Sequence, residues 1–277
     1  MIAAPEEPAP EEPAAEEPAA EEPAAEEPTF VLLHGAWHGG WVWERVAPLL
    51  RAAGHRVHTP TFTGVSDRAH ELHRGVGLDT HVDDVVTLLD AEDLTDVVLV
   101  GHSYAGQVVT AVADRRPERL RARVHLDAFV GRDGEAAIDL LPPTIAGHYR
   151  ESVAGPGQGW LIPVRSLQVL GVTDAEDLAW LTPRLTPQPW RTYTDPLALS
   201  GAHRAVPATF VECTDWMRVF RPHAERAREA GWPVLELPTG HEAMVTAPEE
   251  LAAVLLGIAR QPRAAGAMTT ATYDPNP

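Results

Sequence analysis

The sequence of 277 residues predicts an α/β fold, in which a mainly parallel sheet is flanked by helices. Residues 30–33 and 97–100 form two runs without a polar side chain, as expected of parallel strands that helices cover on both faces. Segments with helical periodicity separate these runs. Strands that alternate with helices in this way predict one parallel sheet.

The first strand, at residues 30–33, is followed by a glycine-rich segment at 34–40 and then by a helix. The helix is expected to end at Gly54, because glycine accommodates the left-handed conformation that often ends helices. A second strand is expected at 55–59, and a polar loop at 61–78 leads to a helix over 80–91. The apolar face of the first helix consists of Val42, Val46, Leu49 and Leu50.

The next strand, at 96–100, is followed by a helix that reaches about residue 116 and by a short strand at 123–127. The same alternation resumes towards the C-terminus. The elements expected there are strands at 208–213 and 232–237 and helices at 222–230 and 248–259.

Residues 129–205 interrupt the alternation and are rich in proline, glycine and short helical pieces. An insertion of this length is unusual for a loop and is commonly functional. Its large apolar side chains predict a hydrophobic pocket, although they could instead only pack the insertion onto the sheet. These side chains are Trp160, Leu161, Ile162, Leu167, Leu170, Trp180 and Trp190.

Charge divides the chain into a tail and a domain. Residues 1–28 repeat Glu-Glu-Pro and contain ten Glu and no basic residue, so they supply −10 of the net charge of −18. Like charges repel and proline disrupts helices and sheets, so we expect a disordered acidic tail here. A folded domain is expected at 29–260 and a second, flexible tail at 261–277.

Composition excludes several classes of protein. All 22 basic residues are Arg, which removes the Lys needed for Schiff-base chemistry and for a phosphate-binding loop. The negative charge argues against nucleic-acid and membrane partners, and no apolar run approaches the roughly 20 residues of a membrane span. The N-terminus lacks the features of a secretory signal, so we expect a cytoplasmic protein. The one cysteine, Cys213, excludes an intrachain disulfide and a cysteine-based zinc site, and we expect it to be a buried strand residue.

The strongest chemical signal is the stretch Gly-His-Ser-Tyr-Ala-Gly at residues 101–106, between an expected strand and an expected helix. A nucleophilic serine must project from a very tight turn, which small residues two positions before and after it allow. Gly101 and Ala105 meet this requirement around Ser103, although Ala105 departs from the usual glycine. The alternative is a serine that only caps the helix.

A serine nucleophile needs a base, and His241 is the best candidate because it follows the last strand. The carboxyl ends of parallel strands meet at one edge of a sheet, so this turn and the serine turn converge. His34 and His38 lie on a glycine-rich loop rather than a helix, which argues against a metal pair. Other histidines are expected to be structural or exposed: His102 in the serine turn, His55 and His58 on a strand, and His70, His73 and His81 at the surface.

The base needs an acid that orients it, and two residues at the carboxyl ends of strands qualify. Asp127 ends the strand that follows the serine turn and its helix, and Asp215 follows the next-to-last strand. Either could instead cap a helix or a turn. We favour Asp127 as the acid and keep Asp215 as the alternative.

Residues 31–41, Val-Leu-Leu-His-Gly-Ala-Trp-His-Gly-Gly-Trp, and the serine turn resemble the plant methylesterase and hydroxynitrile lyase group and its bacterial relatives in the α/β-hydrolase superfamily. The resemblance covers roughly residues 29–260. It implies the α/β-hydrolase fold, a chain order of serine, acid and histidine, and a helical lid at about 129–205 after the sixth strand. It also implies that no cofactor or metal is needed.

The resemblance bears on the acid as well. In the group, the acid usually lies three or four residues after the position of Cys213, where this chain has Trp216 and Met217, which cannot act as acids. Asp215 stands one or two residues too early. Zearalenone-type lactonases instead place the acid after the sixth strand, and Asp127 matches that placement.

Two backbone amides are expected to form an oxyanion hole, which stabilises the negative charge that develops on the substrate. One is the amide of Tyr104, the residue after the nucleophile, and the other is by resemblance that of Ala36. The glycines around Ala36 let the backbone approach the substrate closely.

The rubber-tree type of hydroxynitrile lyase has Thr at the position of Gly35, and Lys, which supplies charge for the cyanide leaving group, at the position of Glu242. Glu242 has the opposite sign. We therefore predict a carboxylesterase-type serine hydrolase that cleaves small, largely apolar esters or lactones through an acyl-enzyme. The alternatives are a ligand-binding or receptor-like protein with weak turnover and a hydroxynitrile lyase. We expect a monomer or homodimer.

Overall fold

The computed structural model describes residues 27–262. A six-stranded sheet forms its centre in the order β2-β1-β3-β4-β7-β8, and every adjacent pair of these strands is parallel. The prediction of an α/β fold with a parallel sheet is therefore confirmed. The strands are β1 (Thr29–Leu33), β2 (Val57–His58), β3 (Val97–His102), β4 (Leu120–Leu126), β7 (Ala208–Cys213) and β8 (Val234–Leu237).

Two predicted segments fall largely outside this range. Residues 1–26, which hold most of the acidic repeat, and residues 263–277, which hold most of the expected C-terminal tail, are not among the described residues. The two tails therefore stay predictions.

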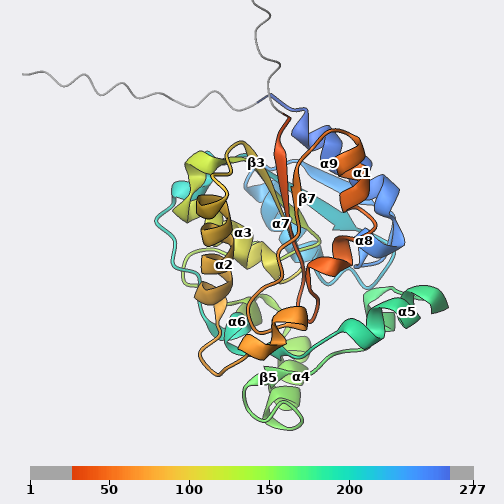
Figure 1. Cartoon of the computed structure of the whole chain (residues 1–277). Coiled ribbons are helices and arrows are strands. Elements are labelled where there is room, and N and C mark those ends of the chain that lie inside the picture. The colour runs from red at the N-terminus through yellow and green to blue at the C-terminus, as the bar shows by residue number, and fades with distance from the viewer. Residues whose placement is uncertain (1–26, 263–277) are drawn as a thin grey trace, which may run out of the picture.

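Six helices flank the sheet. They are α1 (Ala47–Ala52), α2 (Leu78–Ala91), α3 (Ala105–Arg115), α7 (Arg221–Glu229), α8 (Ala243–Thr246) and α9 (Pro248–Ala259). Successive strand residues point to opposite faces of the sheet and so build two hydrophobic cores. Val31 and Leu99 lie in the core that includes α2, α3 and α7, whereas Phe30 and Val98 lie in the core that includes α1, α8 and α9. Figure 1 shows α2 and α3 on one side and α1, α8 and α9 on the other.

The helix expected after the first strand is divided into a short 3-10 helix, η1 (Gly40–Trp43), and α1. Pro48 stands in the first turn of α1. Proline lacks a backbone N–H and fits only the first turn of a helix, so a new helix begins there. The other 3-10 helices are η2 (Ser66–Glu71), η3 (Pro117–Arg119), η4 (Ala137–Leu140), η5 (Leu167–Leu170), η6 (Thr182–Arg184) and η7 (Ala202–Ala205).

The insertion at 129–205 joins β4 to β7 and covers the end of the sheet at which the strands finish (Figure 1). It follows β4, the fourth strand along the described residues. Trp37, just after β1, fixes it by donating from its backbone amide to Gln188 Oε1 (3.2 Å) and from Nε1 to Ile162 O (3.2 Å). The insertion contains α4 (Pro143–Ala154), β5 (Leu161–Ile162), α5 (Ala175–Leu181), β6 (Gln188–Pro189) and α6 (Arg191–Thr194).

Among residues 27–262, no helix combines the length and the apolar character that crossing a membrane requires.

Candidate active site

Ser103 occupies a tight turn between β3 and α3. Its φ of +54° is unusual for a residue with a side chain and is typical of a strained functional turn. The turn is held in place because the Ser103 amide donates to Leu126 O (3.1 Å). A Cβ atom at Gly101 would lie only 2.7 Å from Ala105 O, so the turn requires glycine at that position.

Ser103 and His241 line the same cavity, which has a volume of about 360 Å³. Its wall is mainly aromatic and aliphatic, and Arg165 is the one residue of permanent positive charge among the described residues that line it. The aromatic side chains among its lining residues are, besides two histidines, Trp37, Phe129, Tyr149, Tyr193, Trp216 and Phe220.

His241 faces Asp127 on its other side. The histidine Nδ1 donates to Asp127 Oδ2 at 2.7 Å, and the Asp127 carboxylate also accepts from the Cys213 amide (3.4 Å). Asp127 is completely buried, and burial raises the pKa of its carboxyl group, while the hydrogen bond from His241 opposes that rise. Because Nδ1 pairs with Asp127, Nε2 is the ring nitrogen of His241 that is directed away from the acid.

Asp215, the alternative acid, is exposed and is not in contact with His241. Its amide donates to Thr239 O (3.0 Å), which makes it part of the loop that leads to His241. The next residue, Trp216, packs its ring 4.6 Å from the imidazole of His241. Trp216, which occupies one of the positions where the family usually has the acid, thus packs against the candidate base instead.

Aromatic rings surround the His241 imidazole. Phe220 stacks on it at 5.1 Å with an interplanar angle of 3°, and the ring of His102 lies 4.4 Å away. His102 Nε2 donates to the backbone oxygen of His241 (3.0 Å), which fits the structural role expected for His102. Burial lowers the pKa of His102 well below its ordinary value, so this ring is neutral.

The expected oxyanion donors have free backbone amides. Neither the Ala36 amide nor the Tyr104 amide donates to a backbone oxygen of residues 27–262. A Cβ atom at Gly35, next to Ala36, would lie 3.1 Å from Ser103 Cβ, so the first loop passes directly against the serine turn. These amides are therefore available to a substrate oxygen.

A buried polar cluster that the sequence did not predict lies behind the cavity. Glu242 is 1% exposed and does not line the cavity; its Oε2 lies 3.6 Å from Nε2 of the equally buried His38. Within residues 27–262, neither Glu242 oxygen has a hydrogen-bond partner, and the same holds for His102 Nδ1. His38 Nδ1 in turn donates to Ala36 O (2.7 Å). The cluster thus connects the loops that carry Ala36, Ser103 and His241.

Donor atoms of His102, His241 and Glu242 lie within 4.8 Å of one another, a spacing that a metal ion could use. One nitrogen of each histidine already serves another partner, since His241 Nδ1 bonds Asp127 and His102 Nε2 bonds a backbone oxygen. A metal at this place would have to take the remaining nitrogen of the candidate base. The donor set therefore fits a metal poorly if His241 is to act as a base.

Two other sequence predictions need correction. His81 was expected at the surface, but it is completely buried, donates to Thr63 O (3.0 Å) and lies 3.1 Å from the Tyr104 hydroxyl. Burial lowers its pKa to about 4. Of the apolar insertion residues expected to line the pocket, only Leu170 does so; Trp160, Leu161, Ile162, Leu167, Trp180 and Trp190 do not.

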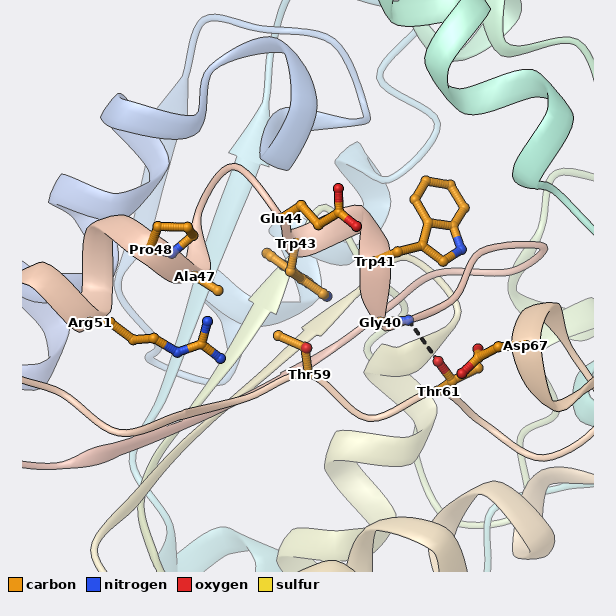
Figure 2. A pocket seen from close by; sticks show the side chains of 10 residues that line it. All are labelled: Gly40, Trp41, Trp43, Glu44, Ala47, Pro48, Arg51, Thr59, Thr61 and Asp67. Carbon is orange, nitrogen blue, oxygen red and sulfur yellow. Dashed lines mark hydrogen bonds between the residues drawn. The ribbon is translucent and has the colours of Figure 1, made fainter.

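Another pocket, of about 520 Å³, lies over η1 and the start of α1 (Figure 2). Glu44, Arg51 and Asp67 line it, and so do Gly40 and Thr61, of which the Gly40 amide donates to Thr61 Oγ1 (3.0 Å). It contains neither Ser103 nor His241. The cavity that holds both is the better candidate for an active site.

Comparison with known proteins agrees with this architecture. Over 240 residues the chain is 41% identical to a carbendazim hydrolyzing esterase from Nocardioides sp. (strain SG-4G), covering 83% of this chain and 98% of that protein. Over 105 residues it is 38% identical to salicylic acid-binding protein 2 of Nicotiana tabacum, covering 36% of this chain and 39% of that protein.

Among solved structures, an extracellular α/β-hydrolase from a Paenibacillus species superposes with a TM-score of 0.76 at 23% identity, covering 84% of this chain and all of that one. At that identity the likeness shows the fold alone. The family model described as "Alpha/beta hydrolase family" matches residues 30–254, which are almost the whole described domain. The chain belongs to the α/β hydrolase family.

Proposed function

We propose that this protein is a carboxylesterase-type serine hydrolase that cleaves small, largely apolar esters or lactones through an acyl-enzyme. The observation that carries the proposal is the His241–Asp127 hydrogen bond of 2.7 Å beside the cavity that Ser103 lines. Ser103 is the nucleophile, His241 the base and Asp127 the acid that orients it. The esterase activity named for the 41% identical relative supports the reaction class.

In the first half of the reaction, Ser103 Oγ attacks the ester carbonyl and His241 Nε2 takes its proton. His241 then gives that proton to the leaving alcohol, and an ester between Ser103 and the acyl group remains. In the second half, His241 takes a proton from water as the water attacks the acyl-enzyme. His241 then gives this proton to Ser103 Oγ while the bond between Oγ and the acyl carbon breaks, which releases the acid and restores the free enzyme. Asp127 stabilises the imidazolium in both halves.

The amides of Ala36 and Tyr104 stabilise the tetrahedral intermediates in this mechanism. Both are free within the described backbone, and the loop of Gly35 is pressed against the serine turn. Removing one such donor typically costs about 3 kcal/mol of transition-state stabilisation. The insertion serves as the lid, since α4 and the segment around Val169 and Leu170 supply much of the cavity wall.

The cavity favours a compact, aromatic or aliphatic substrate. Its volume of about 360 Å³ is at the small end of ligand sites, and its walls are largely apolar. Carbendazim, named for the relative, is therefore a reasonable first compound in a panel with short p-nitrophenyl esters and small lactones.

The decisive experiment compares the hydrolysis of p-nitrophenyl acetate and butyrate by the wild type, Ser103→Ala and a control, Ser166→Ala. Ser166 is exposed and lies outside the cavity lining. We expect Ser103→Ala to lose nearly all turnover and the control to retain it. Equal rates of ester hydrolysis in wild type and Ser103→Ala would contradict the proposal.

Two alternatives are less well supported. A ligand-binding protein with weak turnover was suggested by an uncertain acid, and the contact between Asp127 and His241 argues against it. The rubber-tree type of hydroxynitrile lyase has Lys where this chain has Glu242, whose side chain faces His38 rather than the cavity. Cyanide release from mandelonitrile would favour the lyase.

A further inference from the structure

A separate pocket between the end of α7, the start of β7 and the segment around η7 is rich in arginine, and we call it the arginine pocket. Its volume is about 890 Å³, and none of its lining residues lines the catalytic cavity. Four arginines and two carboxylates line it: Arg123, Arg132, Arg204, Arg226, Asp133 and Glu229. An excess of positive charge is unexpected in a chain with a net charge of −18.

Arg123, on β4, is the unusual member. Its side chain is 3% exposed, and it forms no ion pair with residues 27–262. Its Nε donates to Val206 O at 3.5 Å, the limit of a hydrogen bond, and its guanidinium carbon lies 4.6 Å from the ring centre of Trp232. Burial lowers its pKa to about 10, so it stays charged at neutral pH.

Two other arginines close to the sheet are neutralised by carboxylates. Arg218 pairs with the buried Glu212 (2.6 Å), and Arg121, two residues before Arg123 on the same strand, pairs with Asp96 (2.7 Å). A buried charge without an opposite charge is costly, so an unpaired one at the wall of a cavity points to a partner from outside the chain.

The other charges in the pocket leave it positive. Arg132 and Glu229 are 3.7 Å apart and largely exposed, and an exposed ion pair of this kind contributes little to stability. The Asp133 carboxylate accepts from the Leu199 amide (2.8 Å). Arg204 is exposed and forms no ion pair within the described residues. Arg226 is balanced by Glu135 (2.6 Å), which does not line the pocket.

We propose that the arginine pocket binds a small organic molecule that carries a phosphate or carboxylate group, with the Nη atoms of Arg123 as donors to that group. The guanidinium fork suits both anions because it can donate two parallel hydrogen bonds. The volume leaves room for an organic part beyond the anion. Arg123 lies four residues before Asp127, about 13 Å along the strand, so the site is distinct from the catalytic one.

The test measures binding of phenyl phosphate and of benzoate to the full-length protein by calorimetry at constant ionic strength, with choline chloride as a control salt. The arm that binds more tightly identifies the anionic group. The variants are Arg123→Met, which keeps most of the aliphatic length, and Arg74→Met as the matched control. Arg74 also stacks on a tryptophan, Trp160 (5.0 Å), but lies outside the pocket.

We expect saturable binding to wild type and Arg74→Met and a loss of about tenfold or more in Arg123→Met, as for a charge-assisted hydrogen bond. Without ligand, Arg123→Met should melt at or above the wild-type temperature, because it removes a buried unpaired charge. A second variant, Arg204→Gln, changes an exposed residue of the pocket and should also weaken binding. It tests the proposal even if Arg123→Met does not fold.

The proposal is overturned if neither anion binds the wild type saturably at millimolar concentrations, or if Arg123→Met binds as tightly as wild type. A lower melting temperature of ligand-free Arg123→Met combined with no anion binding would assign Arg123 to packing against Trp232 instead. None of these outcomes depends on the esterase assay, so this test and the proposed function fail separately.

Discussion

His241 Nδ1 lies 2.7 Å from Asp127 Oδ2, although 114 positions separate the two residues along the chain. Parallel pairing produces this proximity. β4, β7 and β8 are neighbours in the sheet, so the residues that follow β4 and β8 emerge at the same edge. The Asp127 amide donates to Val211 O (2.7 Å), and the carboxylate accepts from the amide of Cys213, the last residue of β7, so it lies within reach of the loop after β8.

This relationship predicts different effects for the two candidate acids. Asp127→Asn should lower kcat for p-nitrophenyl esters by about 10⁴, because the amide no longer holds the imidazole in the required tautomer. Asp215→Asn, a matched change at an exposed position, should leave kcat within a few-fold of wild type. Steady-state kinetics of both variants decides the matter. A large loss in Asp215→Asn with little change in Asp127→Asn would reverse the assignment.

Gly35 is predicted to be intolerant of any side chain. A Cβ atom there would lie 2.7 Å from His102 Nδ1 and 3.1 Å from Ser103 Cβ, so Gly35→Ala must displace the serine turn or the Ala36 loop. We expect a loss of kcat with a smaller effect on KM, since the oxyanion donors act mainly in the transition state.

The matched control is Gly257→Ala in α9, where an added Cβ meets no atom within 4 Å. That change should leave kcat unaltered and stabilise the helix by roughly 0.5–1 kcal/mol. Thermal melting and ester kinetics of the two alanine variants test this. Unchanged kcat in Gly35→Ala would show that the first loop is not part of the catalytic apparatus.

The buried pair of His38 and Glu242 should be sensitive to which partner is removed. His38 Nδ1 donates to Ala36 O, so Nε2 is the ring nitrogen that faces the Glu242 carboxyl, 3.6 Å from its Oε2. His38→Phe would remove the polar side chain that faces the buried Glu242 carboxyl at 3.6 Å, and we expect the free energy of unfolding to fall by about 3–5 kcal/mol.

Glu242→Gln supplies a neutral amide donor to His38 Nε2, so its cost should be much smaller, about 1 kcal/mol. The double variant His38→Phe, Glu242→Leu should recover much of the loss, because neither polar group remains. A urea-denaturation double-mutant cycle measures the coupling. Strictly additive effects would mean that the two side chains do not interact.

The buried histidines predict a stability that declines in mild acid. Burial lowers the pKa of His34 and His125 to about 3 and that of His81 and His223 to about 4, from 6.5 in the unfolded chain. Below pH 6.5 the unfolded chain therefore binds more protons than the folded one, and the free energy of unfolding falls. Each such histidine contributes a slope of about 1.4 kcal/mol per pH unit in this window. The raised pKa of Asp127 acts in the opposite direction.

Urea unfolding at pH 7.5, 6.5 and 5.5 checks this expectation. His223→Gln provides the comparison: His223 accepts from the Val130 amide (3.1 Å), and a Gln side-chain oxygen can do the same without titrating. Below pH 6.5, the free energy of unfolding should depend less steeply on pH in that variant, because one fewer histidine takes up a proton on unfolding. Equal stabilities at pH 7.5 and 5.5 in the wild type would contradict the prediction.

The elements with a local cause were predictable from sequence. The helix expected at 248–259 matches α9, since Pro248 suits its first turn and Glu249 and Glu250 favour the positive end of its dipole. The strand expected at 208–213 matches β7, because it is buried on both faces. Both cases depend on residue preferences within a few positions.

Features that depend on tertiary contacts were harder to predict. Asp127 and Asp215 both follow strands, and only the three-dimensional structure shows that one meets His241 while the other is exposed. His81 was misjudged because its partners, Thr63 O and the Tyr104 hydroxyl, come from other elements. A local signal existed: His81 stands four residues before Val85, an apolar residue, and so shares a face of α2 with it. The approach of Glu242 to His38 left no signal in the sequence.

The hydrogen bonds of Trp37 limit how this enzyme can be re-engineered. Its amide, carbonyl and indole nitrogen reach Gln188, Thr186 and Ile162 of the insertion, while the residue before it is Ala36. Replacing the insertion with that of a relative, in order to acquire its substrate range, would therefore also change the hydrogen bonds that hold the Ala36 loop in place. A functional chimera therefore has to take Trp37 and its three partners from the same parent protein.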